Sequence, residues 1–182
     1  MTQSEVKILL DTAINGDLHP VERRDALKNL ALTVEKNSGC ADSDSSYDEL
    51  LPQPLRDVRL AESEKSEIVR VLCKQIQIEP LGCGVLTELL WAIGKTDVGP
   101  SADALRCVLA CTLERQLSGS ELRQAILCLE DLTYMVQDRE LIPLLPLLTH
   151  LKANVIATRH DESLNAINSY FAKLGKRGLP GV

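Results

Sequence analysis

Hydrophobic residues recur every three to four positions along most of the chain, which is the period of an amphipathic α-helix. The pattern predicts eight helices, over residues 2–16, 20–36, 63–78, 80–95, 101–117, 120–137, 139–155 and 161–176. The seventh contains Pro143 and Pro146. Because proline removes a helical hydrogen bond and clashes with the preceding turn, we expect this helix to begin near Pro143 or to be kinked. Aromatic residues are only 3% of the chain, and we expect an all-α fold with no large sheet.

The eight helices fall into four antiparallel hairpins with a repeating length. The second helix of each pair begins near residue 20, 82, 120 or 161, and the last three starts are about 40 residues apart. Removing the long loop of the first interval restores the same period. Two helices per unit at this period resemble α-solenoids of the HEAT and armadillo kind. A compact helical bundle would give much of the same pattern, and both architectures stay open for this single domain, residues 1–182.

A polar segment at about residues 38–60 interrupts the helical pattern. It is rich in Ser, Asp and Pro, and it carries an acidic cluster of Asp42, Asp44, Asp48 and Glu49. We expect a long acidic surface loop, since such clusters of polar and helix-breaking residues form loops. Loops of this length inside a domain are often functional, and a solvated insertion is the alternative.

The charge of the chain limits the classes of partner. The 26 acidic residues outnumber the 20 basic residues, which gives a net charge of -6. A dedicated nucleic-acid binder normally carries a basic patch, so we expect no direct nucleic-acid partner. No apolar run approaches the ~20 residues that span a bilayer, and the N-terminus lacks the features of a signal peptide. We therefore expect a cytoplasmic protein with no membrane partner.

No motif of known chemistry is present. Gly94-Lys95-Thr96 resembles the end of a phosphate-binding loop, but Leu89 stands where that motif needs glycine. His160-Asp161 is better explained by a helix N-terminus that Asp161 caps. Four of the six cysteines lie in apolar helical patterns and are expected to be buried free thiols, Cys73, Cys107, Cys111 and Cys128. We expect no catalytic residues, no cofactor and no metal site.

One surface strip stands out as a candidate binding site. The helices over 80–95 and 120–137 are expected to be neighbours, and their outward positions would line one concave face. That face would combine two aromatic and three acidic side chains, Glu88, Trp91, Glu130, Asp131 and Tyr134. Trp and Tyr are favoured at the centres of protein interfaces. The alternative is that Trp91 packs against an adjoining helix while the acids are simply solvated.

The architecture and the segment TELLWAIGKTD, residues 87–97, are similar to the all-helical, HEAT-like immunity proteins of bacterial toxin systems of the contact-dependent growth inhibition type. This resemblance implies a non-enzymatic inhibitor that binds a cognate toxin and occludes its active site. A nuclease toxin would be basic, and the acidic strip and loop would attract it. The alternative is a helical-repeat adaptor or assembly factor that binds a peptide or helix of a cellular partner. Either protein is expected to be a monomer when free.

Overall fold

In the computed structural model, residues 2–38, 49–96, 101–117 and 119–179 are described. Eight helices of ten or more residues are present: α1 (Thr2–Ile14), α2 (Pro20–Lys36), α5 (Glu62–Ile78), α6 (Val85–Gly94), α7 (Ser101–Glu114), α8 (Gly119–Met135), α10 (Leu145–Thr158) and α11 (Asp161–Lys176). Three short elements are also described: α4 (Gln53–Arg56), α9 (Asp138–Leu141) and the 3-10 turn η1 (Ile142–Leu144). No strand occurs in these ranges, and the prediction of an all-α fold is confirmed.

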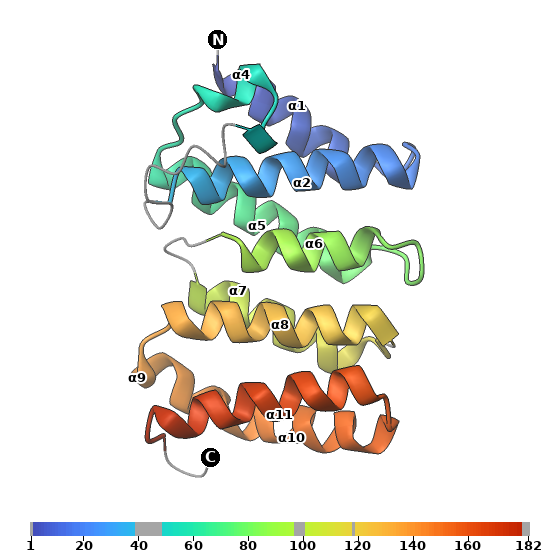
Figure 1. The fold of residues 1–182 in the computed structure, drawn as a ribbon, viewed down its shortest axis with the longest axis vertical. Coiled ribbons are helices and arrows are strands. Elements are labelled where there is room, and N and C mark those ends of the chain that lie inside the picture. Colours follow the sequence, from blue (N-terminus) through green and yellow to red (C-terminus); the bar gives the residue numbers. More distant parts are fainter. Residues whose placement is uncertain (1, 39–48, 97–100, 118, 180–182) are drawn as a thin grey trace.

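The helices form four hairpins that stack in chain order into two layers (Figure 1). Helices α2, α6, α8 and α11 lie side by side in one layer, each packed against the next. Helices α5, α7 and α10 lie behind them, and α1 pairs with α2 at the N-terminal end. The core lies between the layers and consists mainly of Leu, Ile, Val and Ala side chains. Each hairpin therefore buries its apolar stripes both within itself and against its neighbours.

Helix α6 begins later than the pattern predicted. The sequence pattern started it at Pro80, whereas the helix starts at Val85. Gly82 and Gly84 have φ angles of +82° and +77°, in the left-handed region where glycine is favoured. These two residues form the turn after α5, and the shorter α6 has buried side chains at six of its ten positions.

Histidine, not aspartate, caps α11. The prediction that Asp161 is the cap is wrong, because Asp161 is the first helical residue and His160 occupies the cap position. The His160 ring Nδ1 accepts a hydrogen bond from the backbone N–H of Ser163 at 3.3 Å. His19 caps α2 in the same way, accepting from the backbone N–H of Val21 at 3.3 Å. A ring nitrogen thus supplies the acceptor that the free amides of each helix start require.

Part of the expected surface loop is built into the core. Asp42, Asp44 and Asp48 lie outside the described residues, but residues 49–60 are described and contain α4. Leu51 and Val58 are each 1% exposed. The prediction of a surface loop is therefore wrong for residues 49–60. Prolines and polar residues separate the apolar side chains of this part, but these side chains are buried against the N-terminal hairpin.

A polar clamp holds the returning chain against the end of α2. The Asn37 side chain donates to the carbonyl oxygens of Thr33 and Val58 and accepts from the backbone N–H of Leu60 at 2.9 Å. Lys65 is 2% exposed, and its ammonium donates to the Asn37 carbonyl at 2.9 Å and to the Glu62 carboxylate. The clamp satisfies buried polar groups that would otherwise destabilise the fold.

Arginine side chains join successive hairpins at the ends of their helices. Arg115, after α7, donates to the carbonyl oxygens of Ile76 and Glu79 at the end of α5. Arg177, after α11, donates to the carbonyl oxygens of Thr133 and Val136 at 2.7 and 2.9 Å. Because the last carbonyls of a helix lack partners within it, these arginines satisfy them from the next hairpin.

The helix expected over residues 139–155 is interrupted near its prolines, as the sequence predicted. The chain passes from α9 through η1, which contains Pro143, into α10, which has Pro146 in its first turn. Within the described part of the chain, Asp138–Thr158 is the one helical stretch that length and composition would allow to cross a membrane. Within this stretch, α10 buries Leu148, Leu151 and Val155 and lies in the second layer (Figure 1).

Candidate protein-binding surface

Exposed and partly buried positions of the first-layer helices, together with the buried Glu130, make up a surface that we call the paired-charge face. It is defined by Arg24 and Glu35 on α2, Glu88, Trp91 and Lys95 on α6, Arg123, Leu127, Glu130, Asp131 and Tyr134 on α8, and Glu162, Ala166 and Lys173 on α11. Helical spacings of three, four or seven residues bring the members on α6, α8 and α11 to one side of each helix. Of the five residues predicted from sequence for the strip, Asp131 and Tyr134 are exposed, Glu88 and Trp91 are half-buried, and Glu130 is buried.

The two aromatic residues differ in exposure. Tyr134 is 62% exposed near the end of α8. Trp91 is half-buried and packs against the core. The alternative given for Trp91, packing against an adjoining helix, accounts for part of its ring, and Tyr134 is the aromatic side chain available to a partner.

Helix α2 contributes charged partners that the sequence analysis did not foresee. The Glu88 carboxylate lies 3.5 Å from the Arg24 guanidinium. Lys95, at the end of α6, lies 3.1 Å from Glu35. Both pairs are partly exposed, where ion pairs contribute on the order of 0–1 kcal/mol of stability. Their main effect on the face is to cancel charge.

The remaining acids of the strip are also compensated. Glu130 is 8% exposed, and Lys173 of α11 donates to its carboxylate, which raises the pKa of Lys173. Burial raises the pKa of Asp131, and the positive charge of Lys95 opposes that shift. The Asp131 carboxylate packs against Gly94 of α6, whose missing side chain leaves room for it.

The acidic side chains of the strip therefore lie next to basic side chains, and the strip does not present a surface of negative charge alone. Glu88 and Glu130 pair with Arg24 and Lys173 within the chain, and Asp131 lies within the electrostatic influence of both Lys95 and Lys173. The expectation of an uncompensated acidic strip is corrected on this point. The spacing along α6 and α8 identified the acids, but the ion-pair partners of Glu88 and Glu130 belong to α2 and α11.

A hollow between α8 and α11 was not foreseen from the sequence. It has a volume of about 530 Å³ and is lined by Arg123, Leu127, Glu162, Asn165 and Ala166. Leu127 and Ala166 provide its apolar part, while the Arg123 guanidinium and the Glu162 carboxylate are 3.7 Å apart. The lining combines two apolar residues with three polar or charged residues, and protein interfaces also combine apolar and polar contacts.

A smaller hollow lies between α2 and α6. Its volume is about 220 Å³, and Val21, Arg24, Asp25, Lys28 and Glu88 line it. Its lining is mostly charged, so it offers a polar border rather than an anchor point. Of the acidic cluster Asp42, Asp44, Asp48 and Glu49, Glu49 alone is described, and it is exposed.

The described residues contain no group of three or more His, Cys, Asp or Glu side chains able to hold a metal ion. His19 and His160 are engaged as helix caps, and His150 on α10 is exposed beside Asn154 at 3.4 Å. The face thus presents aromatic, apolar and paired charged groups, which suit contact with another macromolecule.

Comparisons with protein-family models, curated proteins and solved structures find no match to this chain. Its function is therefore argued from the geometry.

Proposed function

We propose that the protein is a non-enzymatic protein-binding module and that its partner docks on the paired-charge face. The observation that carries this proposal is that an exposed aromatic side chain, Tyr134, lies on the same side of α8 as Leu127, which lines the hollow between α8 and α11. Tyrosine is enriched among residues that dominate binding energy. The hollow would receive an apolar side chain of the partner, and the surrounding ion pairs would form a polar rim.

The adaptor function is the better supported of the two alternatives. The face carries acids and bases in nearly equal number, so its field would neither attract nor repel a strongly charged protein. A helix or peptide with one apolar anchor and polar flanks would match the hollow and its rim. We infer that the module recognises such a segment of a cytoplasmic protein.

Neutralisation of a basic toxin is the second candidate, and the net charge of -6 favours it. A negative protein accelerates association with a positive partner even when individual contacts are balanced. On this proposal the protein would be a bacterial immunity protein, and the face would occlude the active site of its toxin.

The experiment is affinity capture with the tagged full chain from the cells in which the gene occurs, at moderate salt. Two variants address the site: Tyr134→Ala removes the aromatic anchor, and Ala166→Arg fills the hollow. Each is expected to raise the Kd for the captured partner on the order of tenfold or more. Ile78→Ala is the matched control, because Ile78 is 73% exposed on α5 in the other layer.

The identity of the partner separates the two functions. A basic toxin whose binding weakens steeply with salt supports neutralisation, and an inhibition assay of the toxin then follows. A neutral or acidic protein bound with little dependence on salt supports the adaptor. If both face variants bind as well as the parent chain, the paired-charge face is not the interface.

A further inference from the structure

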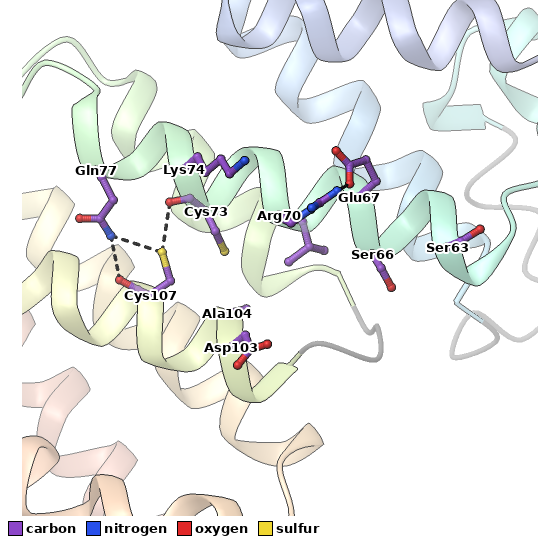
Figure 2. A pocket seen from close by; sticks show the side chains of 11 residues that line it. Ser63, Ser66, Glu67, Arg70, Cys73, Lys74, Gln77, Asp103, Ala104 and Cys107 are labelled. Atoms are coloured by element: carbon purple, nitrogen blue, oxygen red, sulfur yellow. Dashed lines mark hydrogen bonds and ion pairs between the residues drawn. The ribbon is translucent and has the colours of Figure 1, made fainter.

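A second concavity lies in the opposite layer, between α5 and α7. The first-layer helices α6 and α8 pack closely through Gly94, whereas α5 and α7 leave a groove of about 600 Å³ between them. Figure 2 shows Cys73 on α5 and Cys107 on α7 along this groove, with Gln77 beside them and Arg70, Lys74 and Asp103 around its edge. The proposed protein-binding function does not use this groove.

The Cys107 thiol is held in place by contacts with α5. When protonated, its Sγ donates to the backbone carbonyl of Cys73, with 3.1 Å between sulfur and oxygen. The Gln77 side-chain amide donates to the Cys107 sulfur at 3.3 Å and to its backbone carbonyl at 3.1 Å (Figure 2). Cys107 is half-buried and faces the groove, so a small molecule entering the groove can reach its sulfur.

These contacts favour ionisation of one thiol of the pair. Hydrogen bonding from the Cys73 thiol, assisted by Gln77, lowers the pKa of Cys107 to about 7, although burial opposes the shift. The same interaction and burial raise the pKa of Cys73 well above its ordinary value. Cys107 is then the thiolate, which is the nucleophilic form, and Cys73 is a protonated thiol next to it.

We propose that Cys107 is a site of reversible oxidation by hydroperoxides and that Cys73 resolves the product as a disulfide between α5 and α7. The Cys107 thiolate attacks the peroxide O–O bond, forming the sulfenic acid and releasing hydroxide or alkoxide. The Cys73 sulfur then attacks the sulfenic sulfur, losing its proton and expelling the oxygen as water. The two sulfurs lose two electrons in total, which the peroxide gains. A dithiol reductant restores both thiols by exchange.

The other described cysteines differ from this pair in ways that give the reaction its selectivity. Cys111 and Cys128 are both 0% exposed, and burial raises the pKa of each. Cys83 is half-buried near the turn after α5, with its sulfur 3.4 Å from the carbonyl oxygen of Pro80. Within the described residues, only the Cys73–Cys107 pair combines a hydrogen bond between two cysteines, from the Cys107 sulfur to the Cys73 backbone carbonyl oxygen, with a groove that gives access.

The test is treatment of the reduced full chain with hydrogen peroxide, followed by intact-mass measurement and peptide mapping. We expect the loss of two hydrogen atoms, a cross-linked peptide that joins Cys73 to Cys107, and reversal by dithiothreitol. Cys83→Ser is the matched control and should form the same cross-link. A cross-link between other cysteines, or none at all, would overturn the proposal.

Variants at Cys73 test the resolving role independently of the cross-link. Cys73→Ala should leave Cys107 as a sulfenic acid that dimedone traps, and it should slow alkylation of Cys107 at pH 7 by about fivefold, since the hydrogen-bond donor is lost. Cys73→Ser keeps a hydroxyl donor, so alkylation should stay close to the parental rate while the disulfide no longer forms. Equal alkylation rates in the Ala and Ser variants, both folded by circular dichroism, would contradict the assignment.

Discussion

The guanidinium of Arg23 on α2 forms a two-pronged ion pair with the carboxylate of Glu79 at the end of α5, with N···O distances of 2.7 and 2.5 Å. Arg23 is 4% exposed and Glu79 is 0% exposed. Arg23 also donates to the Ala13 carbonyl at 3.1 Å, and Gln75 donates to Glu79 at 2.7 Å. The pair thus joins the first two hairpins at a point that water does not reach.

Removing one member of this pair should destabilise the protein strongly. Arg23→Met or Glu79→Leu alone leaves a buried charge without its partner, and we expect each to lower the free energy of unfolding by about 3–5 kcal/mol. The double variant should cost far less than the sum, since no uncompensated charge remains. Urea unfolding followed by circular dichroism measures all three. Additive single effects would show that the two residues act separately.

Gly94 controls the approach of α6 to α8. A Cβ at this position would lie 3.1 Å from the Asp131 carboxylate oxygen and 3.4 Å from the Cys128 Cα. We expect Gly94→Ala to destabilise the fold by about 1 kcal/mol through overpacking, despite the higher helix propensity of alanine. Asp131→Ala should relieve most of that cost in the double variant, as thermal unfolding would show.

Gly175→Ala provides the control for this comparison. Gly175 lies in α11, and an added Cβ there meets no atom within 4 Å. The reduced freedom of the unfolded chain should then stabilise the protein by about 0.5–1 kcal/mol. Stabilisation of similar size at Gly94 would mean that close helix approach does not depend on glycine.

Tyr170 should make stability fall at alkaline pH. It is 1% exposed, its hydroxyl lies 2.6 Å from the Thr133 hydroxyl, and burial raises its pKa from 10.0 to about 12. A raised folded-state pKa favours the fold below pH 10, and this contribution is lost as the pH rises from 10 towards 12. From pH 9 to pH 11, Tyr170→Phe should therefore gain about 1.4 kcal/mol relative to the parent chain. A constant difference across this range would place the hydroxyl in contact with water.

The histidine cap of α11 should have a measurable effect on stability. His160→Ala removes the acceptor for the Ser163 N–H and should lower the free energy of unfolding by about 1 kcal/mol. His160→Asn supplies another good cap and should recover most of the loss. His150→Ala, an exposed change on α10, is the control and should stay within about 0.5 kcal/mol of the parent chain. An equal loss in the Ala and Asn variants would exclude capping as the cause.

Apolar periodicity was sufficient to predict the helices, because each helix buries one stripe against the next hairpin. The start of α6 was mistaken because periodicity continues through residues 80–84, and two glycines with positive φ decide the turn. The buried half of the 38–60 segment was missed because the prolines and polar residues around Leu51, Leu55 and Val58 indicated a loop, although these side chains are spaced by four and three residues. Their burial depends on packing against the N-terminal hairpin, which the pattern within the segment does not show.

The candidate site was predicted only in part, for a related reason. Spacing along each helix predicts which side of α6 or α8 carries Glu88, Asp131 and Tyr134. It does not show which residues of the neighbouring helices lie opposite them. Arg24 and Lys173 were therefore missed as the partners that neutralise the acids. The sequence did contain a signal for these ion pairs, namely opposite charges at corresponding positions of neighbouring first-layer helices.

Side-chain contacts between successive hairpins limit how this molecule could be shortened. Solenoids are usually extended or shortened by whole repeats, because each repeat contacts only its neighbours. Here, deleting α10 and α11 with the residues that follow would remove both Lys173 and Arg177, and Glu130 would lose its ion-pair partner. Deleting α1 and α2 would leave Glu79 as a carboxylate without Arg23. The four hairpins are therefore not interchangeable modules, and a shortened version would need redesigned ends rather than a simple cut between hairpins.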